Sequence, residues 1–108
     1  MAGIRVLSPV AGEALELLGA RVRLERRRRR WTVEGLAERV GVSPTTIRKV
    51  ERGDATVAIG TAFEAAVLVG VTLFHDDAAR RALESDALAA RLALLPAVVR
   101  PLRVDDDF

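Results

Sequence analysis

The sequence contains no cysteine, no tyrosine and only one histidine. Without cysteine there is no disulfide framework, no thiolate metal site and no thiol nucleophile. The single histidine, His75, has no serine or carboxylate constellation that the sequence can place beside it, and we interpret it as a surface loop residue. Clustered carboxylates are confined to an acidic tail. We therefore expect no catalytic site, no metal site and no cofactor.

Long apolar segments are also missing. No segment approaches the roughly 20 apolar residues needed to span a bilayer, and the first residues lack the apolar run of a signal peptide. The 108 residues are 50% hydrophobic and 30% charged, which is typical of one globular, soluble domain with room for a tail. We expect a cytoplasmic protein without a membrane partner.

The charges are unevenly spread although the net charge is only +2. Residues 1–58 carry twelve Arg or Lys against seven Asp or Glu, whereas residues 59–108 carry five against eight. The first part is therefore the expected face for a polyanion. Sixteen of the seventeen basic residues are arginine, which fits bidentate phosphate contacts and equally fits a GC-rich genome.

Two helix starts lie close together in the stretch 31–54. The first is Thr32, whose hydroxyl can cap a helix, with Trp31 and Leu36 spaced for a hydrophobic staple. Gly41 should end this helix, because glycine tolerates the left-handed conformation. The residues that should be buried are Val33, Leu36, Ala37 and Val40.

The second start is Ser43 followed by Pro44, a cap and a first helical residue that needs no amide donor. Ile47 and Val50 lie three apart and should face the core. A polar set should face away from it, comprising Thr45, Thr46, Arg48, Lys49 and Arg52. The two helices together predict a helix-turn-helix whose second helix enters the major groove of DNA. The alternative is an ordinary solvated helix face.

The surrounding segments should complete the core. We expect an arm over residues 1–9, a helix over 12–29 and a helix over 59–69. The run Arg26–Arg30 closes the first of these helices, either as a solvated helix end or with part of it beside a phosphate. The expected core residues are Leu15, Leu18, Val22, Ile59, Phe63, Ala66, Val67, Val71, Leu73 and Phe74.

The composition changes from Asp76 onwards. Asp76 or Asp77 can cap one helix and Ser85 or Asp86 a second, which Pro96 should end. The second helix carries an apolar stripe of Leu88, Leu92 and Leu95, which indicates a subunit or partner interface, with an intramolecular cluster as the alternative. Residues 98–104 could be extended and pair as edge strands across a dimer. The acidic tail that follows could be solvated, or it could be a docking peptide anchored by Phe108.

The stretch Leu36-Ala-Glu-Arg-Val-Gly-Val-Ser43, followed by Ile47 and Glu51-Arg-Gly53, resembles the Xre or lambda-repressor-like helix-turn-helix family over roughly Gly19 to Leu73. The resemblance implies an all-α fold, a compact bundle of five helices, with a recognition helix beginning at Pro44. It also implies an ion pair between Glu51 and Arg26. Positions for base edges would be Pro44, Thr45 and Lys49, and positions near the backbone would be Thr46, Arg48 and Arg52. With the caps, the candidate DNA-binding residues are Thr32, Ser43, Pro44, Thr45, Thr46, Arg48, Lys49 and Arg52.

Two positions depart from the family pattern. Val33 stands where the family commonly has a phosphate-binding glutamine, and Pro44 replaces a residue that often reads a base. Direct readout would then rest on Thr45, Lys49 and Arg48, so we expect modest sequence discrimination and a larger share for phosphate contacts and DNA shape.

A narrower resemblance involves Leu17-Leu-Gly-Ala-Arg-Val-Arg23, the segment Arg52–Thr61 and the terminal Asp-Asp-Asp-Phe108. These residues are similar to HipB-type antitoxins, the partners of HipA-type kinase toxins. The resemblance implies a homodimer that represses its own operon at a near-palindromic operator and binds a HipA-like kinase toxin. A stand-alone Xre-family regulator and an interaction adaptor without DNA binding are the alternatives. We expect a DNA-binding domain over residues 12–74 and an extension for dimerisation or partner binding over residues 75–108.

Overall fold

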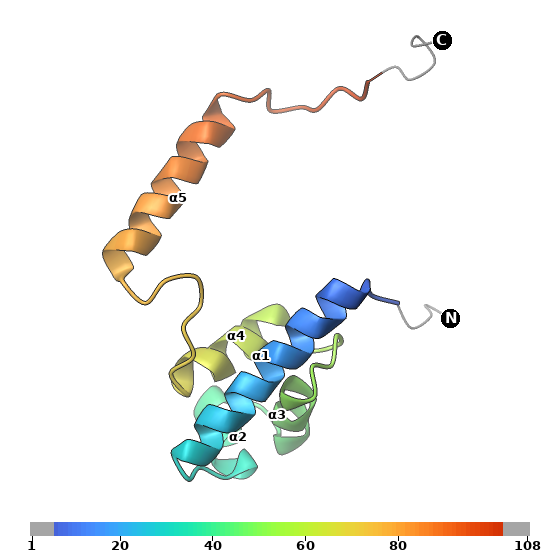
Figure 1. Cartoon of the computed structure of the whole chain (residues 1–108), viewed down its shortest axis with the longest axis vertical. Coiled ribbons are helices and arrows are strands. Elements are labelled where there is room, and N and C mark those ends of the chain that lie inside the picture. The colour runs from blue at the N-terminus through green and yellow to red at the C-terminus, as the bar shows by residue number, and fades with distance from the viewer. Residues whose placement is uncertain (1–5, 103–108) are drawn as a thin grey trace. The chain divides into compact units, whose positions relative to one another are not determined.

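The computed structural model describes residues 6–102 of the chain. These residues form five α-helices and no strand, as Figure 1 shows, which confirms the all-α prediction. The chain divides into two compact units, Met1–Leu73 and Phe74–Phe108. None of the helices in the described part is long and apolar enough to cross a membrane. The helices are α1 (Pro9–Arg28), α2 (Val33–Val40), α3 (Pro44–Glu51) and α4 (Ile59–Leu68) in the first unit and α5 (Ala78–Ala93) in the second.

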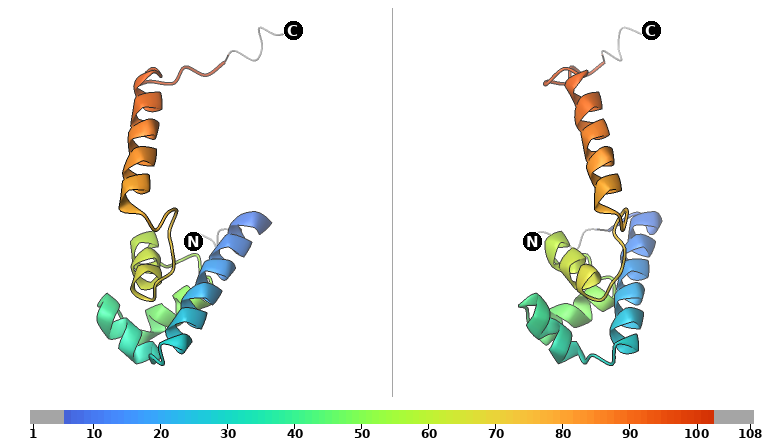
Figure 2. Two further views of the ribbon diagram at one scale, coloured as in Figure 1. Left: turned by 60° about the vertical axis from the view of Figure 1, so that its left-hand side comes forward. Right: turned by 90° about the vertical axis from the view of Figure 1, so that its left-hand side faces the viewer.

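The first unit is built around one hydrophobic core. In both views of Figure 2, α2, α3 and α4 lie on the same side of α1. The helix pairs in contact are α2 with α3, α1 with α3, α2 with α4, and α1 with α4. The buried residues come from α1 to α4 and the turn after α4: Val22, Leu36, Ala37, Ile47, Val50, Ala65, Ala66 and Val69. The core thus fixes α2 and α3 against a shared support.

Two glycines allow α1 to approach α3 closely. A Cβ atom at Gly19 would lie 2.4 Å from the backbone oxygen of Val50. A Cβ atom at Gly53, which has φ of 73°, would lie 2.7 Å from the backbone nitrogen of Glu16. Both distances are far below van der Waals contact, so a side chain at either position would force the helices apart.

The start of α1 differs from the prediction. The helix begins at Pro9 instead of about Gly12, because Ser8 is its N-cap and accepts a hydrogen bond from the Ala11 amide at 3.3 Å. Residues 8 and 9 therefore do not belong to an arm, and Ser8-Pro9 repeats the cap chemistry of Ser43-Pro44. The buried residues predicted for α1 and α2 are confirmed in part, because Leu18, Val33 and Val40 are only partly buried and pack against the buried cluster.

The predicted buried face of α4 was wrong at two positions. Ile59 is 71% exposed and Val67 is 54% exposed, whereas Ala65, Ala66 and Val69 are buried. The sequence of α4 is apolar on nearly every side, so its periodicity cannot select the buried face. Phe74 was also expected in the core but is 81% exposed.

Residues 74–102 of the second unit contain one helix where two were predicted. Asp77 caps α5 by accepting from the Ala79 amide at 2.8 Å, and the helix continues through Ser85 and Asp86 without interruption. No residue of α5 is buried. Residues 98–102 form no strand. The rest of the segment expected to pair across a dimer, the acidic tail and Phe108 lie outside the described residues.

Candidate nucleic-acid interface

The helix-turn-helix is formed by α2, a short turn and α3. Thr32 caps α2 by accepting from the Gly35 amide at 2.9 Å, and Gly41 ends it in the left-handed conformation with φ of 85°. Ser43 caps α3 by accepting from the Thr46 amide at 3.2 Å. Each cap is the one that the sequence predicted, and together they fix where the two helices begin.

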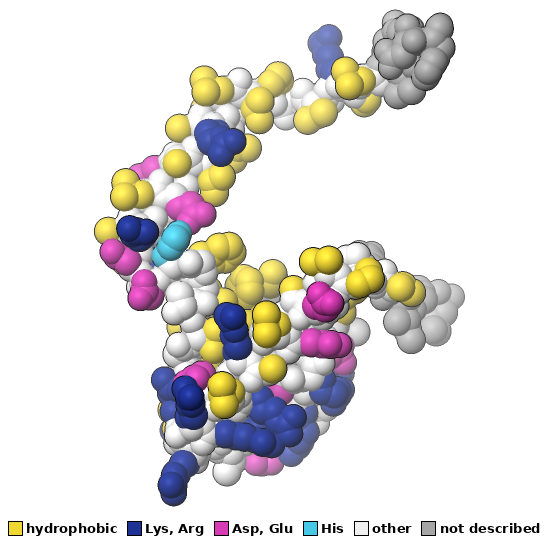
Figure 3. Space-filling view, in the orientation of Figure 1, with side chains coloured by type: hydrophobic (Ala, Val, Ile, Leu, Met, Phe, Trp, Pro, Cys, Tyr) yellow, Lys and Arg dark blue, Asp and Glu magenta, His cyan; other side chains and the backbone are white. Residues whose placement is uncertain are grey.

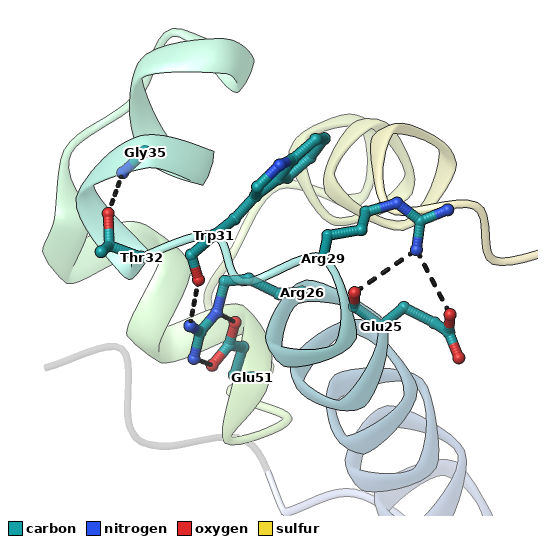
Figure 4. Close-up of polar contacts among 7 residues, drawn as sticks. All are labelled: Glu25, Arg26, Arg29, Trp31, Thr32, Gly35 and Glu51. Atoms are coloured by element: carbon teal, nitrogen blue, oxygen red, sulfur yellow. Dashed lines mark hydrogen bonds and ion pairs between the residues drawn. The ribbon is translucent and has the colours of Figure 1, made fainter.

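A buried ion pair joins α1 to the end of α3. Arg26 Nε lies 2.6 Å from Glu51 Oε2, and Arg26 Nη2 lies 3.0 Å from Glu51 Oε1, so the contact is bidentate. The third guanidinium nitrogen, Nη1, donates to the Trp31 carbonyl at 2.8 Å (Figure 4). Glu51 raises the pKa of Arg26 above its ordinary value by accepting these hydrogen bonds, against the burial that lowers it. This is the pair that the family resemblance implied.

Trp31 lies between the hydrophobic core and a basic side chain. Its ring packs against the core cluster, and the Arg39 guanidinium carbon lies 3.9 Å from the ring centroid. A cation at this distance over the ring face is attracted by the ring quadrupole. With its carbonyl held by Arg26, Trp31 anchors the entry to α2, in agreement with the staple interpretation.

The outward residues of α3 differ in how freely they can contact a ligand. Ser43 Oγ and Thr46 Oγ1 lie 3.0 Å apart, so both hydroxyls already have a partner within the cap. Arg48 Nη2 lies 3.1 Å from Glu34 Oε2 on α2, and Arg52 Nη2 lies 3.6 Å from Asp54 Oδ2. Sequence reasoning did not foresee the Glu34 contact, although Glu34 stands at the second position of α2.

Two predicted base-reading residues have no side-chain hydrogen bond or ion pair within residues 6–102. They are Thr45, which is exposed, and Lys49, which is half-buried. Pro44 is half-buried at the first position of α3 and can offer only apolar contact there. Of the outward residues predicted on α3, Thr45 and Lys49 are therefore the two whose side chains have no polar partner in the part of the chain that the structure describes.

Basic side chains gather over the C-terminal half of α1 (Figure 3). Within the predicted run, Arg26 pairs with Glu51, while Arg28 and Arg29 both lie 3.3 Å from Glu25. A hollow of about 330 Å³ opens where α1, α2 and α3 meet. Its lining consists of Arg23, Arg26, Arg27, Val33, Arg48, Glu51 and Arg52. The sequence prediction included Arg27 only as a member of the run Arg26–Arg30 and did not propose a phosphate contact for Arg23, although their spacing of four residues puts them on one face of a helix.

The fold and the exposed face of α3 define a helix-turn-helix DNA-binding domain. A family model described as a helix-turn-helix domain matches residues 17–83. Because the match covers more than half of the chain, the chain belongs to this helix-turn-helix family, which is Xre-like. No curated protein and no solved structure gives a significant match.

Proposed function

We propose that this protein is a transcriptional repressor that inserts α3 into the major groove of double-stranded DNA. The supporting observation is the division of α3 into two faces. Ile47 and Val50 are buried against the core, whereas Thr45, Arg48 and Arg52 are exposed on the other side. A rigid helix with a polar, basic outer face suits the width and the negative potential of the major groove.

Within this proposal, Thr45 and Lys49 read base edges. Arg48 and Arg52 contact the phosphate backbone, and Arg48 must first exchange its contact with Glu34 for a phosphate. The cap residues Thr32, Ser43 and Thr46, with Pro44, lie beside the backbone. Because few side chains are free for bidentate base contacts, we expect modest discrimination between sequences, with each missing bidentate pair forfeiting about 1–3 kcal/mol.

Dimerisation is the second part of the proposal. Leu88 and Leu92 lie four residues apart on α5 and are 52% and 67% exposed. Leu95, which was predicted to continue the stripe, lies two residues beyond the end of the helix and is 64% exposed. Exposure of such apolar surface to water is unfavourable, and packing of two copies against each other would bury it. A dimer would present two copies of α3 about 34 Å apart, one turn of the double helix, and would prefer a near-palindromic operator.

The antitoxin role is the finer form of the proposal and rests on the resemblance to HipB-type antitoxins. In that form, the repressor also sequesters a HipA-like kinase toxin, with Phe108 as a candidate anchor. A stand-alone regulator would have the same DNA interface without this partner. Co-purification of the full chain with a kinase encoded beside it would support the antitoxin role, and its failure would favour the stand-alone regulator.

DNA binding itself is tested by titrating the full chain with duplex DNA at about 50 and 200 mM salt. Neutralising several phosphates releases counterions, so affinity should fall steeply between the two concentrations. Binding that does not respond to salt, or no binding at either concentration, would contradict the proposal and favour the adaptor alternative.

A further inference from the structure

We propose that the hollow between α1, α2 and α3 binds a phosphodiester group of the DNA backbone through Arg23 and Arg27. This inference rests on the proposed function, since it assigns a second contact surface to the same protein–DNA complex. It assigns the contact of α1 with DNA, left open for the run Arg26–Arg30, to the two arginines that line the hollow.

The charges around the hollow are unbalanced. Of the lining residues, Arg26 and Glu51 neutralise each other through the bidentate pair. Four arginines and Val33 remain. Two of these arginines, Arg48 and Arg52, each have one acidic neighbour, at 3.1 and 3.6 Å. The positive charges that remain around the hollow repel each other, and a bound anion would relieve this repulsion.

The other two arginines of the hollow have no such neighbour among residues 6–102. Arg23 and Arg27 are exposed and have no ion-pair partner in the described part of the chain. On another face of α1, Glu25 pairs with both Arg28 and Arg29 at 3.3 Å. This glutamate therefore neutralises arginines outside the hollow and not the two of α1 that line it. Guanidinium groups offer planar pairs of donors that match phosphate oxygens bidentately.

The position of the hollow favours a phosphate of duplex DNA over a free anion. Two of its lining residues, Arg48 and Arg52, belong to the exposed face of α3. A duplex that receives α3 in its major groove has a phosphate strand at the groove edge. That strand would meet Arg48 and Arg52 first and would bring a phosphodiester to the side of the hollow that faces α3.

Substitution of Glu34 should change the affinity for DNA in the opposite direction to substitution of the arginines. The Glu34 side chain is 64% exposed, and its carboxylate would compete with a phosphate for Arg48. Removing this charge should therefore strengthen DNA binding, whereas removing Arg23 or Arg27 should weaken it.

The experiment measures the affinity of full-length variants for duplex DNA as a function of salt. The double variant Arg23→Gln/Arg27→Gln should bind at least about tenfold more weakly at low salt. The slope of log K against log salt should fall by about 0.9 for each phosphate that the variant no longer neutralises. Glu34→Gln should bind more tightly than the wild type. Circular dichroism should be unchanged, because both arginines are exposed.

The single variant Arg27→Gln should also bind more weakly than the wild type. Arg21→Gln is its matched control, because Arg21 is an exposed arginine on α1 that does not line the hollow. If Arg21→Gln lowers the affinity for DNA and the salt slope as much as Arg27→Gln does, the loss reflects the net charge of the protein. The assignment of a phosphate to the hollow would then be wrong. Displacement of the duplex by inorganic phosphate at matched ionic strength would likewise overturn it in favour of a free anion. Failure of the wild type to bind duplex DNA would instead contradict the proposed function itself.

Discussion

The two units of the chain use apolar residues in opposite ways. In the first unit, four helices bury a cluster that includes Leu36 and Ile47 at 0% exposure. In the second, α5 has sixteen residues and buries none of them. The first unit therefore has a buried core of its own, whereas every apolar residue of α5 is exposed. The helix-turn-helix and the proposed assembly element therefore belong to different units of the chain.

The largest effect should come from breaking the buried ion pair of the first unit. Glu51→Ala leaves Arg26, which is 7% exposed, without its bidentate partner. We expect a loss of about 3–5 kcal/mol in the free energy of unfolding, measured by urea denaturation. Glu38→Ala, at an exposed position of α2, should change it little. A small loss from Glu51→Ala would mean that the pair does not hold α1 to α3.

A smaller loss should follow from Gly19→Ala. The new methyl group would meet the Val50 and Glu51 backbone oxygens at 2.4 and 2.7 Å, so α1 and α3 must separate. We expect the midpoint of urea unfolding to fall, with a cost of about 1–3 kcal/mol. Gly12→Ala on the same helix meets nothing within 4 Å and should stabilise the protein instead. Equal effects of the two substitutions would refute the close approach.

A substitution in α5 should change the oligomeric state of the protein without changing the stability of the first unit. Leu92→Ser removes apolar surface that is 67% exposed, from a helix that does not belong to the first unit. We expect a change within about 0.5 kcal/mol in the unfolding of the first unit. Analytical ultracentrifugation should nevertheless show a shift from dimer to monomer. Val10→Ser, on the exposed side of α1, should leave the dimer intact. An unchanged dimer in Leu92→Ser would remove α5 from the proposed interface.

The smallest effect concerns acid stability at the turn after α3. Asp54 Oδ1 accepts two hydrogen bonds from Thr56, one from the hydroxyl at 2.6 Å and one from the backbone amide at 2.8 Å. These bonds lower the pKa of Asp54 from its ordinary value of 3.8. A depressed folded pKa stabilises the native state above the unfolded pKa, and this contribution is lost as the pH falls through the folded value. Thr56→Val should therefore weaken the decline of thermal stability below about pH 4. Thr72→Val should leave that decline as it is in the wild type.

Local chemistry made much of the first unit predictable. Thr32, Gly41 and Ser43 act within a few residues of their own position, so their capping roles can be inferred without knowledge of the tertiary fold. The partner of Glu51 lies 25 residues away. It came from the family resemblance, because spacing alone does not fix so distant a contact.

The errors share a physical reason. The buried side of α4 and the position of Phe74 depend on which neighbouring helices are present, and an almost uniformly apolar segment carries no period to reveal this. In α5, Ser85 and Asp86 can cap a helix but also tolerate a helix interior, where the surrounding alanines and leucines favour continuation. The contact between Glu34 and Arg48 and the hollow beside Arg23 arise only when separate helices meet, so no local pattern encodes them.

The central claim is that the exposed face of α3 reads duplex DNA. Its most direct test is the affinity of Lys49→Ala for a near-palindromic operator, compared with the wild type at matched salt by fluorescence anisotropy. The operator can be obtained by selection from random duplexes. We predict weaker binding by about 1–3 kcal/mol and a flatter dependence on salt, because Lys49 would contribute both a base contact and a charge. An unchanged affinity would contradict the placement of α3 in the major groove.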